Sequence, residues 1–324
     1  MMKNIFGALI ILLNLTSAGF SLFYEDGLNS LESQNYKEAL NLFEKSLAKK
    51  ELEEYKIRYY IGQCYYYMNE TEKAIKNFER SISLKSNWYL PYHDLGLIYF
   101  EKKNNLKLAE KYFNKAIFFN PLFGLGYYNL GNLYLKMNEP EKAIKMYEKS
   151  LALIKENNIL SKVYLGLGNA YDILNNYAEA IIYYKKSVEL DSKNLKSYLN
   201  MGLVFFKQDL YDEAIENFKN VINLDKGNYI AYFYLGNCFR AQKKFKEMEK
   251  NYIKSFEINP NYADVCYSLA SYYAISGKKD LMLKYLKALF SIDKQYINII
   301  LKDNLFENYK EDEELKKLIR EQGG

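Results

Sequence analysis

The sequence predicts an all-α fold, a solenoid of stacked antiparallel helix pairs, from three features that recur together. A glycine returns every 34 to 37 residues, and an alanine stands at the last interval: Gly27, Gly62, Gly96, Gly131, Gly168, Gly202, Gly236 and Ala270. An alanine follows most of these glycines by twelve residues, or by thirteen once: Ala39, Ala74, Ala109, Ala143, Ala180 and Ala214. An aromatic residue stands four residues beyond each alanine: Phe43, Phe78, Phe113, Tyr147, Tyr184 and Phe218. A fixed period in this range indicates a stacked repeat array.

Each period contains two short helices. In the fourth period, Tyr127, Leu130, Gly131 and Tyr134 follow the i, i+3, i+4, i+7 spacing of one helix face. A turn then leads to Pro140, a residue suited to the first turn of a new helix. A second apolar stripe follows it, so the unit is a helical hairpin.

The recurring small residues indicate how the two helices pack. A glycine inside a helix costs about 1 kcal/mol relative to alanine. Repeating this cost implies that a side chain there would collide with the partner helix, and we expect the glycine to face the alanine. A second small position, expected to let the next unit stack, is filled by Ser46, Ser81, Ala116, Ser150, Ser187 and Ser255.

This pattern resembles the tetratricopeptide repeat. Tyr92–Tyr99 and Tyr127–Tyr134 match the first half of its signature, with Tyr92 where the family often has tryptophan. Asn120-Pro121 and Asn259-Pro260 match its closing turn. The resemblance implies a right-handed α-α superhelix of eight units: 20–53, 55–88, 89–123, 124–157, 161–194, 195–228, 229–262 and 263–296.

Departures from the pattern concentrate near the end of the array. The last two units carry larger or different residues in the small and aromatic positions: Met248, Ala270, Met282, Leu286 and Leu289. These are expected to be compensating size changes in degenerate terminal repeats. About three extra residues, Asn158–Leu160, precede the fifth unit and predict a longer helix or a small bend there.

The N-terminus has the layout of a secretory signal peptide. Lys3 precedes an apolar run, Ile5–Leu15, which small and polar residues follow. We expect residues 1–19 to be removed by cleavage near Ala18 or Gly19, and a bacterial, periplasmic protein to result. An uncleaved inner-membrane anchor extending to Phe23 and retention in the cytoplasm are the alternatives.

The tail, residues 297–324, loses the period. A turn is expected near Lys302–Phe306, followed by a helix over Glu311–Glu321 with an apolar stripe of Leu315, Leu318 and Ile319. Since the last unit of a solenoid would otherwise expose its stacking face, this helix is interpreted as a cap. A tail that binds a partner is the alternative.

Little in the sequence points to chemistry. The chain has a single histidine, His93, so catalytic triads and histidine-rich metal sites are excluded. Cys64, Cys238 and Cys266 lack metal-site spacing and are expected to be buried fillers, although a Cys238–Cys266 bridge is conceivable. A net charge of +5 with alternating signs along the second helices is typical of a solvated face. We therefore expect no enzyme activity, cofactor, small-molecule substrate or nucleic-acid partner.

The resemblance implies that the first helices line a concave groove for other proteins. Carried onto this chain, the groove positions are Tyr59, Gln63, Tyr66, His93, Phe100, Tyr128, Asn132, Lys162, Asn169, Lys196, Phe206, Phe233, Asn237 and Arg240. The amides of Asn132, Asn169 and Asn237 can bond a peptide backbone, or they are ordinary polar surface. Family members that hold a terminal carboxylate use lysines where this chain has Tyr128 and Leu165, so a hydrophobic peptide or helix is the expected ligand.

These observations predict a non-enzymatic scaffold that binds peptide or helical segments of partner proteins in envelope assembly. A self-associating structural component of the envelope is one alternative. A cytoplasmic regulatory subunit of a larger complex is another, and it requires that the signal-peptide interpretation be wrong.

Overall fold

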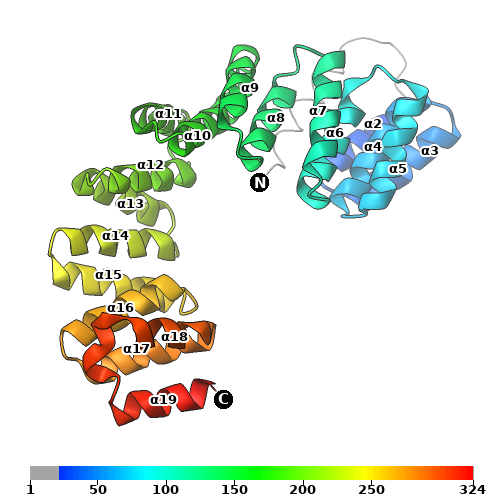
Figure 1. Ribbon diagram of the computed structural model, residues 1–324. Coiled ribbons are helices and arrows are strands. Elements are labelled where there is room, and N and C mark those ends of the chain that lie inside the picture. Colours follow the sequence, from blue (N-terminus) through cyan, green and yellow to red (C-terminus); the bar gives the residue numbers. More distant parts are fainter. Residues whose placement is uncertain (1–21, 324) are drawn as a thin grey trace. The chain divides into compact units, whose positions relative to one another are not determined.

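The computed structural model describes residues 22–323, and every regular element among them is a helix (Figure 1). The all-α prediction is thereby confirmed. The interpretation of residues 1–19 as a signal peptide lies outside the described residues. Within 22–323, no helix combines the length and the apolar character needed to cross a bilayer.

The chain divides into two compact units, up to Asn176 and from Tyr177, and this boundary falls inside the predicted repeat 161–194. Unit 1 contains α2 (Leu22–Glu32), α3 (Tyr36–Ala48), α4 (Glu54–Tyr67), α5 (Thr71–Leu84), α6 (Tyr89–Leu97), η1 (Ile98–Lys102), α7 (Leu106–Phe119), α8 (Gly124–Lys136), α9 (Pro140–Leu153) and α10 (Asn157–Ile173). Unit 2 contains α11 (Tyr177–Leu190), α12 (Leu195–Lys207), α13 (Tyr211–Leu224), α14 (Tyr229–Ala241), α15 (Phe245–Ile258), α16 (Ala263–Ile275), α17 (Lys279–Ile292), α18 (Gln295–Lys302), η2 (Asn304–Tyr309) and α19 (Glu313–Gly323).

Successive helices pack as hairpins, as the period predicts. In unit 1 the pairs are α2–α3, α4–α5, α6–α7 and α8–α9, and in unit 2 they are α12–α13, α14–α15 and α16–α17. The extra residues before the fifth repeat lengthen α10 to 17 residues, which confirms the predicted longer helix. After Gly96 the alanine follows by thirteen residues instead of twelve. The additional residue is accommodated in η1, a π-helical turn, without ending the helix.

Each hairpin turn contains one residue in the left-handed conformation, seven or eight residues after the repeat glycine or Ala270. These residues are Gln34, Asn69, Asn104, Asn138, Asn175, Asp209, Lys243 and Gly277, with φ between 48° and 70°. Such a residue ends a helix while its neighbours still bond the last carbonyl groups, and Gly and Asn adopt the conformation at least cost. Gln34, Asp209 and Lys243 are neither Gly nor Asn and adopt it all the same.

The glycines allow the second helix to approach, but the expectation that its alanine faces the glycine was wrong. A Cβ added to Gly62 would lie 2.7 Å from Cε1 of Phe78, and one added to Gly131 would lie 2.6 Å from Cε1 of Tyr147. The partner helix is therefore the obstacle, as predicted, but its aromatic ring and not its alanine faces the glycine. The ring is long enough to reach across to the first helix, where it leaves no room for a methyl group.

The second small position was expected to let the next unit stack; Ser187 does contact the next repeat, since it accepts from Ser197 Oγ at 2.8 Å, but other serines at this position bond within their own repeat. Ser150 Oγ donates to the carbonyl of Gly124 at 3.0 Å, and Ser255 Oγ donates to that of Tyr229 at 2.8 Å. Each bond ties the end of a second helix to the first turn of its own first helix. A larger residue in place of the serine would push this carbonyl group away and separate the two helix ends.

The three cysteines are free and buried, as expected for apolar fillers. Burial raises the pKa of Cys64 and of Cys238 to about 12, and that of Cys266 to about 11. Thiols of this kind remain protonated and poorly nucleophilic at neutral pH.

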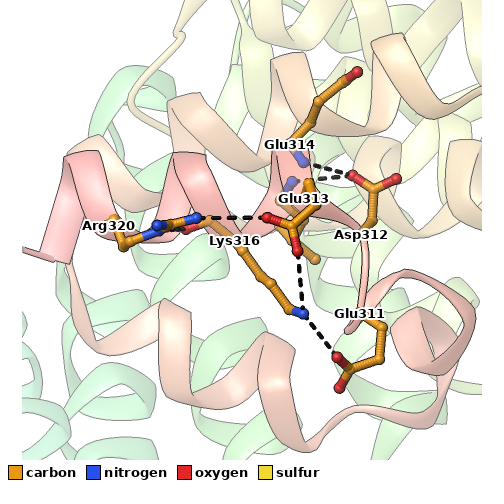
Figure 2. Close-up of polar contacts among 7 residues, drawn as sticks. Glu311, Asp312, Glu313, Glu314, Lys316 and Arg320 are labelled. Atoms are coloured by element: carbon orange, nitrogen blue, oxygen red, sulfur yellow. Dashed lines mark hydrogen bonds and ion pairs between the residues drawn. The ribbon is translucent and has the colours of Figure 1, made fainter.

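The C-terminal helix caps the array, as predicted. Leu315 and Leu318 of α19 are buried and join the core that contains Leu286 and Leu289 of α17. Asp312 begins the helix, because its Oδ1 accepts the backbone N–H groups of Glu314 and Leu315 at 2.9 and 3.1 Å. Figure 2 shows this turn, with Lys316 placed between Glu311 and Glu313. The cap thus covers the apolar face that a further repeat would have covered.

Candidate interaction surface on the first helices

Three predicted groove residues of unit 1 meet in one chain of hydrogen bonds. Gln63 Nε2 donates to Tyr59 Oη at 2.7 Å and to Asp94 Oδ2 at 3.3 Å. The other carboxylate oxygen of Asp94 lies 2.8 Å from His93 Nδ1, and His93 Nε2 lies 2.8 Å from Asn129 Nδ2. These five residues, here called the polar ladder, connect α4, α6 and α8.

The polar ladder is buried. Its members are between 2% and 9% exposed, which places a carboxylate inside the protein. A buried charge is tolerated only when it is well hydrogen-bonded, and the Gln63 amide and His93 ring provide those bonds. Burial, followed by the nearby Asp94 charge, raises the pKa of Tyr59 well above its usual value. The ladder therefore joins three repeats to one another and does not present Tyr59, Gln63 or His93 as a free surface.

The geometry of the ladder also decides what His93 can do. The Asn129 amide lies at hydrogen-bond distance from Nε2 of the His93 ring, and the Asp94 carboxylate lies at hydrogen-bond distance from its Nδ1. Both ring nitrogens are then occupied inside the protein. The His–Asp pair has no free nitrogen with which to take a proton from a substrate, so it is a structural pair.

Sequence reasoning missed Asp94 and Asn129. Asp94 lies in the first-helix segment Tyr92–Tyr99, which was used only to match the repeat signature. The available signal was a carboxylate within a largely apolar first-helix segment. Asn129 had no comparable signal, because one amide in a first helix is common.

The half-buried residues next to the ladder are mainly aromatic. Tyr66 Oη donates to Glu101 Oε2 at 2.9 Å, and both burial and Glu101 raise the pKa of Tyr66. Lys136 Nζ lies 5.0 Å from the centre of the Phe100 ring. Tyr128 is also half-buried, and burial raises its pKa. These side chains offer partly exposed rings with fixed positions.

Two predicted groove amides are held by their own second helix. Tyr147 Oη donates to Asn132 Oδ1 at 2.7 Å, and Tyr252 Oη donates to Asn237 Oδ1 at 2.5 Å. The bond occupies the carbonyl oxygen and orients the amide. In the sequence, Tyr184 stands at the same distance from Asn169. Repeats with phenylalanine at the tyrosine position have other residues at the asparagine position: Leu28, Gln63, Leu97 and Leu203.

The remaining predicted residues differ in exposure. Lys162 and Asn169 on α10 are half-buried, whereas Lys196 on α12 and Arg240 on α14 are exposed. Phe206 is half-buried against the rings of Tyr211 and Tyr234, at 5.7 and 5.8 Å between centres. Phe233 is buried against Tyr252 and Tyr262. In unit 2 the structure thus brings Phe233 and Asn237 together around Tyr252.

Among residues 22–323, no three His, Cys, Asp or Glu side chains are grouped as a metal site would require.

Comparison with known proteins identifies the repeat. Family models described as tetratricopeptide repeat match residues 55–87, 91–121, 124–193, 199–247 and 263–296, which together make up more than half of the chain. No curated protein matches the sequence.

Three solved structures illustrate the similarity of fold. The C-terminal part of a TPR repeat-containing protein from Cytophaga hutchinsonii has a TM-score of 0.58 and 19% identity, over 75% of this chain and 97% of that one. PilW, described as a widely conserved type IV pilus biogenesis factor, has a TM-score of 0.58 and 16% identity, over 65% and 96%. A chain of the APC/C hetero-tetramer Cut9-Hcn1 has a TM-score of 0.56 and 18% identity, over 89% and 52%. At these identities the likeness is one of fold.

Proposed function

We propose that this chain, which belongs to the tetratricopeptide repeat family, is a non-enzymatic scaffold that binds peptide or helical segments of partner proteins on its first helices. The observation that carries the proposal is the held amide of Asn132. Its Oδ1 accepts the hydroxyl of Tyr147, and the amide also bonds the side chain of Tyr128, so its orientation on the first helix is fixed. An oriented amide loses little freedom on binding, which favours affinity.

The partly exposed rings on the first helices of unit 1 define the ligand class. Tyr66, Phe100 and Tyr128 are half-buried and restrained, so they provide apolar contact area at little entropic cost. Some family members hold a terminal carboxylate with two lysines. This chain has Tyr128 and Leu165 at the matching positions and so lacks those lysines. A hydrophobic peptide or the apolar face of a helix is therefore the proposed ligand.

The proposed setting is the envelope of a bacterium, where the scaffold would assist assembly. Support comes from the signal-peptide layout of residues 1–19, with Lys3 before the apolar run Ile5–Leu15. If this segment is retained, it would anchor the chain to the inner membrane. Peptide sequencing of the mature N-terminus, together with fractionation of cells, distinguishes cleavage from retention.

Crosslinking in living cells tests the scaffold function. A photoreactive residue at position 128 should capture a discrete partner, and one at Lys111 on the exposed side of α7 should not. Replacing Tyr128, Asn132 and Asn169 together by alanine should reduce capture from a photoreactive residue at position 66 by at least about tenfold, since each contact of this kind contributes about 1 kcal/mol or more. Far-ultraviolet circular dichroism should show unchanged helicity. Equal capture by the triple variant would exclude the first-helix face as the binding surface.

A further inference from the structure

A second groove lies in unit 2, among α13, α14 and α15. Its volume is about 940 Å³. The floor consists of Tyr232, Leu235 and Phe239 on α14, and the two flanking helices contribute Ile222 and Ile253. These α14 residues lie on a different side of the helix from Asn237 and Arg240, because three- and four-residue spacings keep each set on its own side.

The edges of the groove are basic. Lys246, Lys250 and Lys254 line it from α15 at intervals of one turn, and Lys219 lines it from α13. Among the described residues, only Lys254 of these four forms an ion pair, with Glu257 at 3.2 Å. The other lysines therefore leave a positive charge along the groove.

The nearby carboxylates compensate this charge only in part. Glu249 accepts the hydroxyl of Tyr273 at 2.6 Å and faces Lys278 at 3.9 Å, so it is engaged with the following repeat. Glu257 is engaged with Lys254. Glu247 is the remaining carboxylate in the lining.

The apolar floor does not follow from the fold alone. A groove of about 560 Å³ in unit 1 is lined by Arg58 and Tyr65 of α4, at the positions that correspond to Tyr232 and Phe239 in the repeat. Its other lining residues are Lys73, Lys76, Asn77 and Arg80 of α5. The same place in the hairpin is thus cationic in one repeat and apolar with basic edges in another.

We propose that the α13–α15 groove is a second docking site, which binds an acidic amphipathic helix of a partner protein. The apolar side chains of this helix would cover the floor, and its carboxylates would face the lysine row. Residues four apart on any helix are about 6 Å apart along its axis, so carboxylates at i and i+4 match the spacing of Lys246 and Lys250. A volume near the upper end for ligand pockets suits a few anchoring side chains of such a helix.

A docking site here would add a second binding surface to the one proposed on unit 1. Tyr232, Leu235 and Phe239 line this groove, and none of the residues proposed to bind a peptide in unit 1 does. One scaffold could then hold two different partners at once. This inference goes beyond the proposed function and does not depend on it.

Fluorescence anisotropy with two designed helical peptides and the full chain tests the inference. Both peptides carry leucines at i, i+3, i+4 and i+7, and one has glutamate where the other has lysine on the flanks. The glutamate peptide should bind at least about tenfold more tightly at low salt, and the difference should shrink as salt screens the charges. Equal binding of the two peptides, or no binding of the glutamate peptide, would overturn the proposal.

Matched charge reversals locate the site. The double variant Lys246→Glu, Lys250→Glu should bind the glutamate peptide at least about tenfold more weakly. The control Lys107→Glu, Lys111→Glu has the same spacing and charge change on exposed positions of α7, and it should change binding less than about twofold. Equal weakening by the control would show that general charge, and not this groove, attracts the peptide.

The two proposed surfaces can be tested separately. The triple alanine variant at Tyr128, Asn132 and Asn169 should bind the glutamate peptide normally, since none of these residues lines the groove. Loss of peptide binding in this variant would place the peptide on the first-helix surface and contradict the second site. Loss of cellular crosslinking at position 128 with peptide binding intact would reject the proposed function and leave the second site standing.

Discussion

Replacing Gly62 by alanine while removing the ring opposite it measures the contact on which the helical hairpin depends. A Cβ at Gly62 would lie 2.7 and 2.8 Å from Cε1 and Cδ1 of Phe78, which is fully buried. Carbon atoms in contact are about 3.5–4.0 Å apart, so the overlap is about 1 Å. Overpacking of this kind costs about 1–3 kcal/mol. Since alanine gains about 1 kcal/mol in helix propensity, Gly62→Ala alone should destabilise the protein by about 0–2 kcal/mol.

A double-mutant cycle removes the propensity term. Gly62→Ala should be better tolerated together with Phe78→Leu, because the shorter side chain leaves room for the methyl group. Alanine gains its propensity with either residue at position 78, so the coupling energy reports the steric contact alone. We expect the double variant to be about 1–2 kcal/mol more stable than the sum of the single effects. Repeat 8 already has this combination, Ala270 with Leu286.

Urea denaturation followed by far-ultraviolet circular dichroism, at constant m-value, gives the four free energies of unfolding. A second cycle that combines Gly62→Ala with Ala74→Gly is the matched control. It should show little coupling, because the ring and not the alanine faces Gly62. Additive effects in the Phe78 cycle, or rescue by Ala74→Gly, would refute the steric explanation.

Three further predictions follow from single features. Lys243 has a φ of 59°, so Lys243→Gly should raise the free energy of unfolding by about 0.5–1 kcal/mol, whereas Gly277→Ala at the equivalent turn should lower it. Leu315→Ala should lower the free energy of unfolding by about 2–5 kcal/mol, because this side chain is 1% exposed in the cap. Lys317→Ala on the exposed side of α19 should change it by less than about 0.5 kcal/mol, and equal losses in the two variants would contradict the role of α19 as a cap. Folding raises the pKa of Cys64 from 9.0 to about 12, so the thiol of the unfolded chain loses its proton at a lower pH than that of the folded chain. The contribution of this thiol to the free energy of unfolding is therefore fully present below pH 9 and falls by about 1.4 kcal/mol per pH unit above it. The drop in urea midpoint from pH 8 to pH 10 should therefore be smaller in Cys64→Ala than in the parent, with the tyrosines contributing equally to both, and an unchanged drop would show that the thiol is not protected.

Much of the fold could be predicted because the same sequence constraints recur in every repeat. Each glycine marks a close approach, and each Asn or Asp in a hairpin turn marks a helix end, so errors at one unit are corrected by the others. What could not be predicted depends on single residues. The alanine of the second helix was expected to face Gly62, where the structure has an aromatic ring. Spacing shows which residues recur and not how far a side chain reaches. The division at Asn176 had no counterpart in the period.

The candidate surface was harder to predict than the fold. Fourteen positions were assigned by correspondence with other repeat proteins, yet Tyr59, Gln63 and His93 are buried in contacts with neighbouring repeats, and Phe233 and Asn237 are buried as well. The bonds of the polar ladder join residues 31 and 36 positions apart. Helical periodicity carries no information over that distance. The Asn–Tyr pairs were available from the sequence, because both residues change together from one repeat to another.

The polar ladder has a consequence for how the chain reaches its native order. Similar hairpins can stack in the wrong succession during folding, since their apolar faces are nearly interchangeable. Gln63, Asp94 and Asn129 occur in successive hairpins, and their hydrogen bonds are complete only when these hairpins are direct neighbours. Any other succession would take the Gln63 amide away from the Asp94 carboxylate and the Asn129 amide away from His93, and buried polar groups that lose hydrogen bonds are costly. One carboxylate thus sets the register of a series of otherwise interchangeable units.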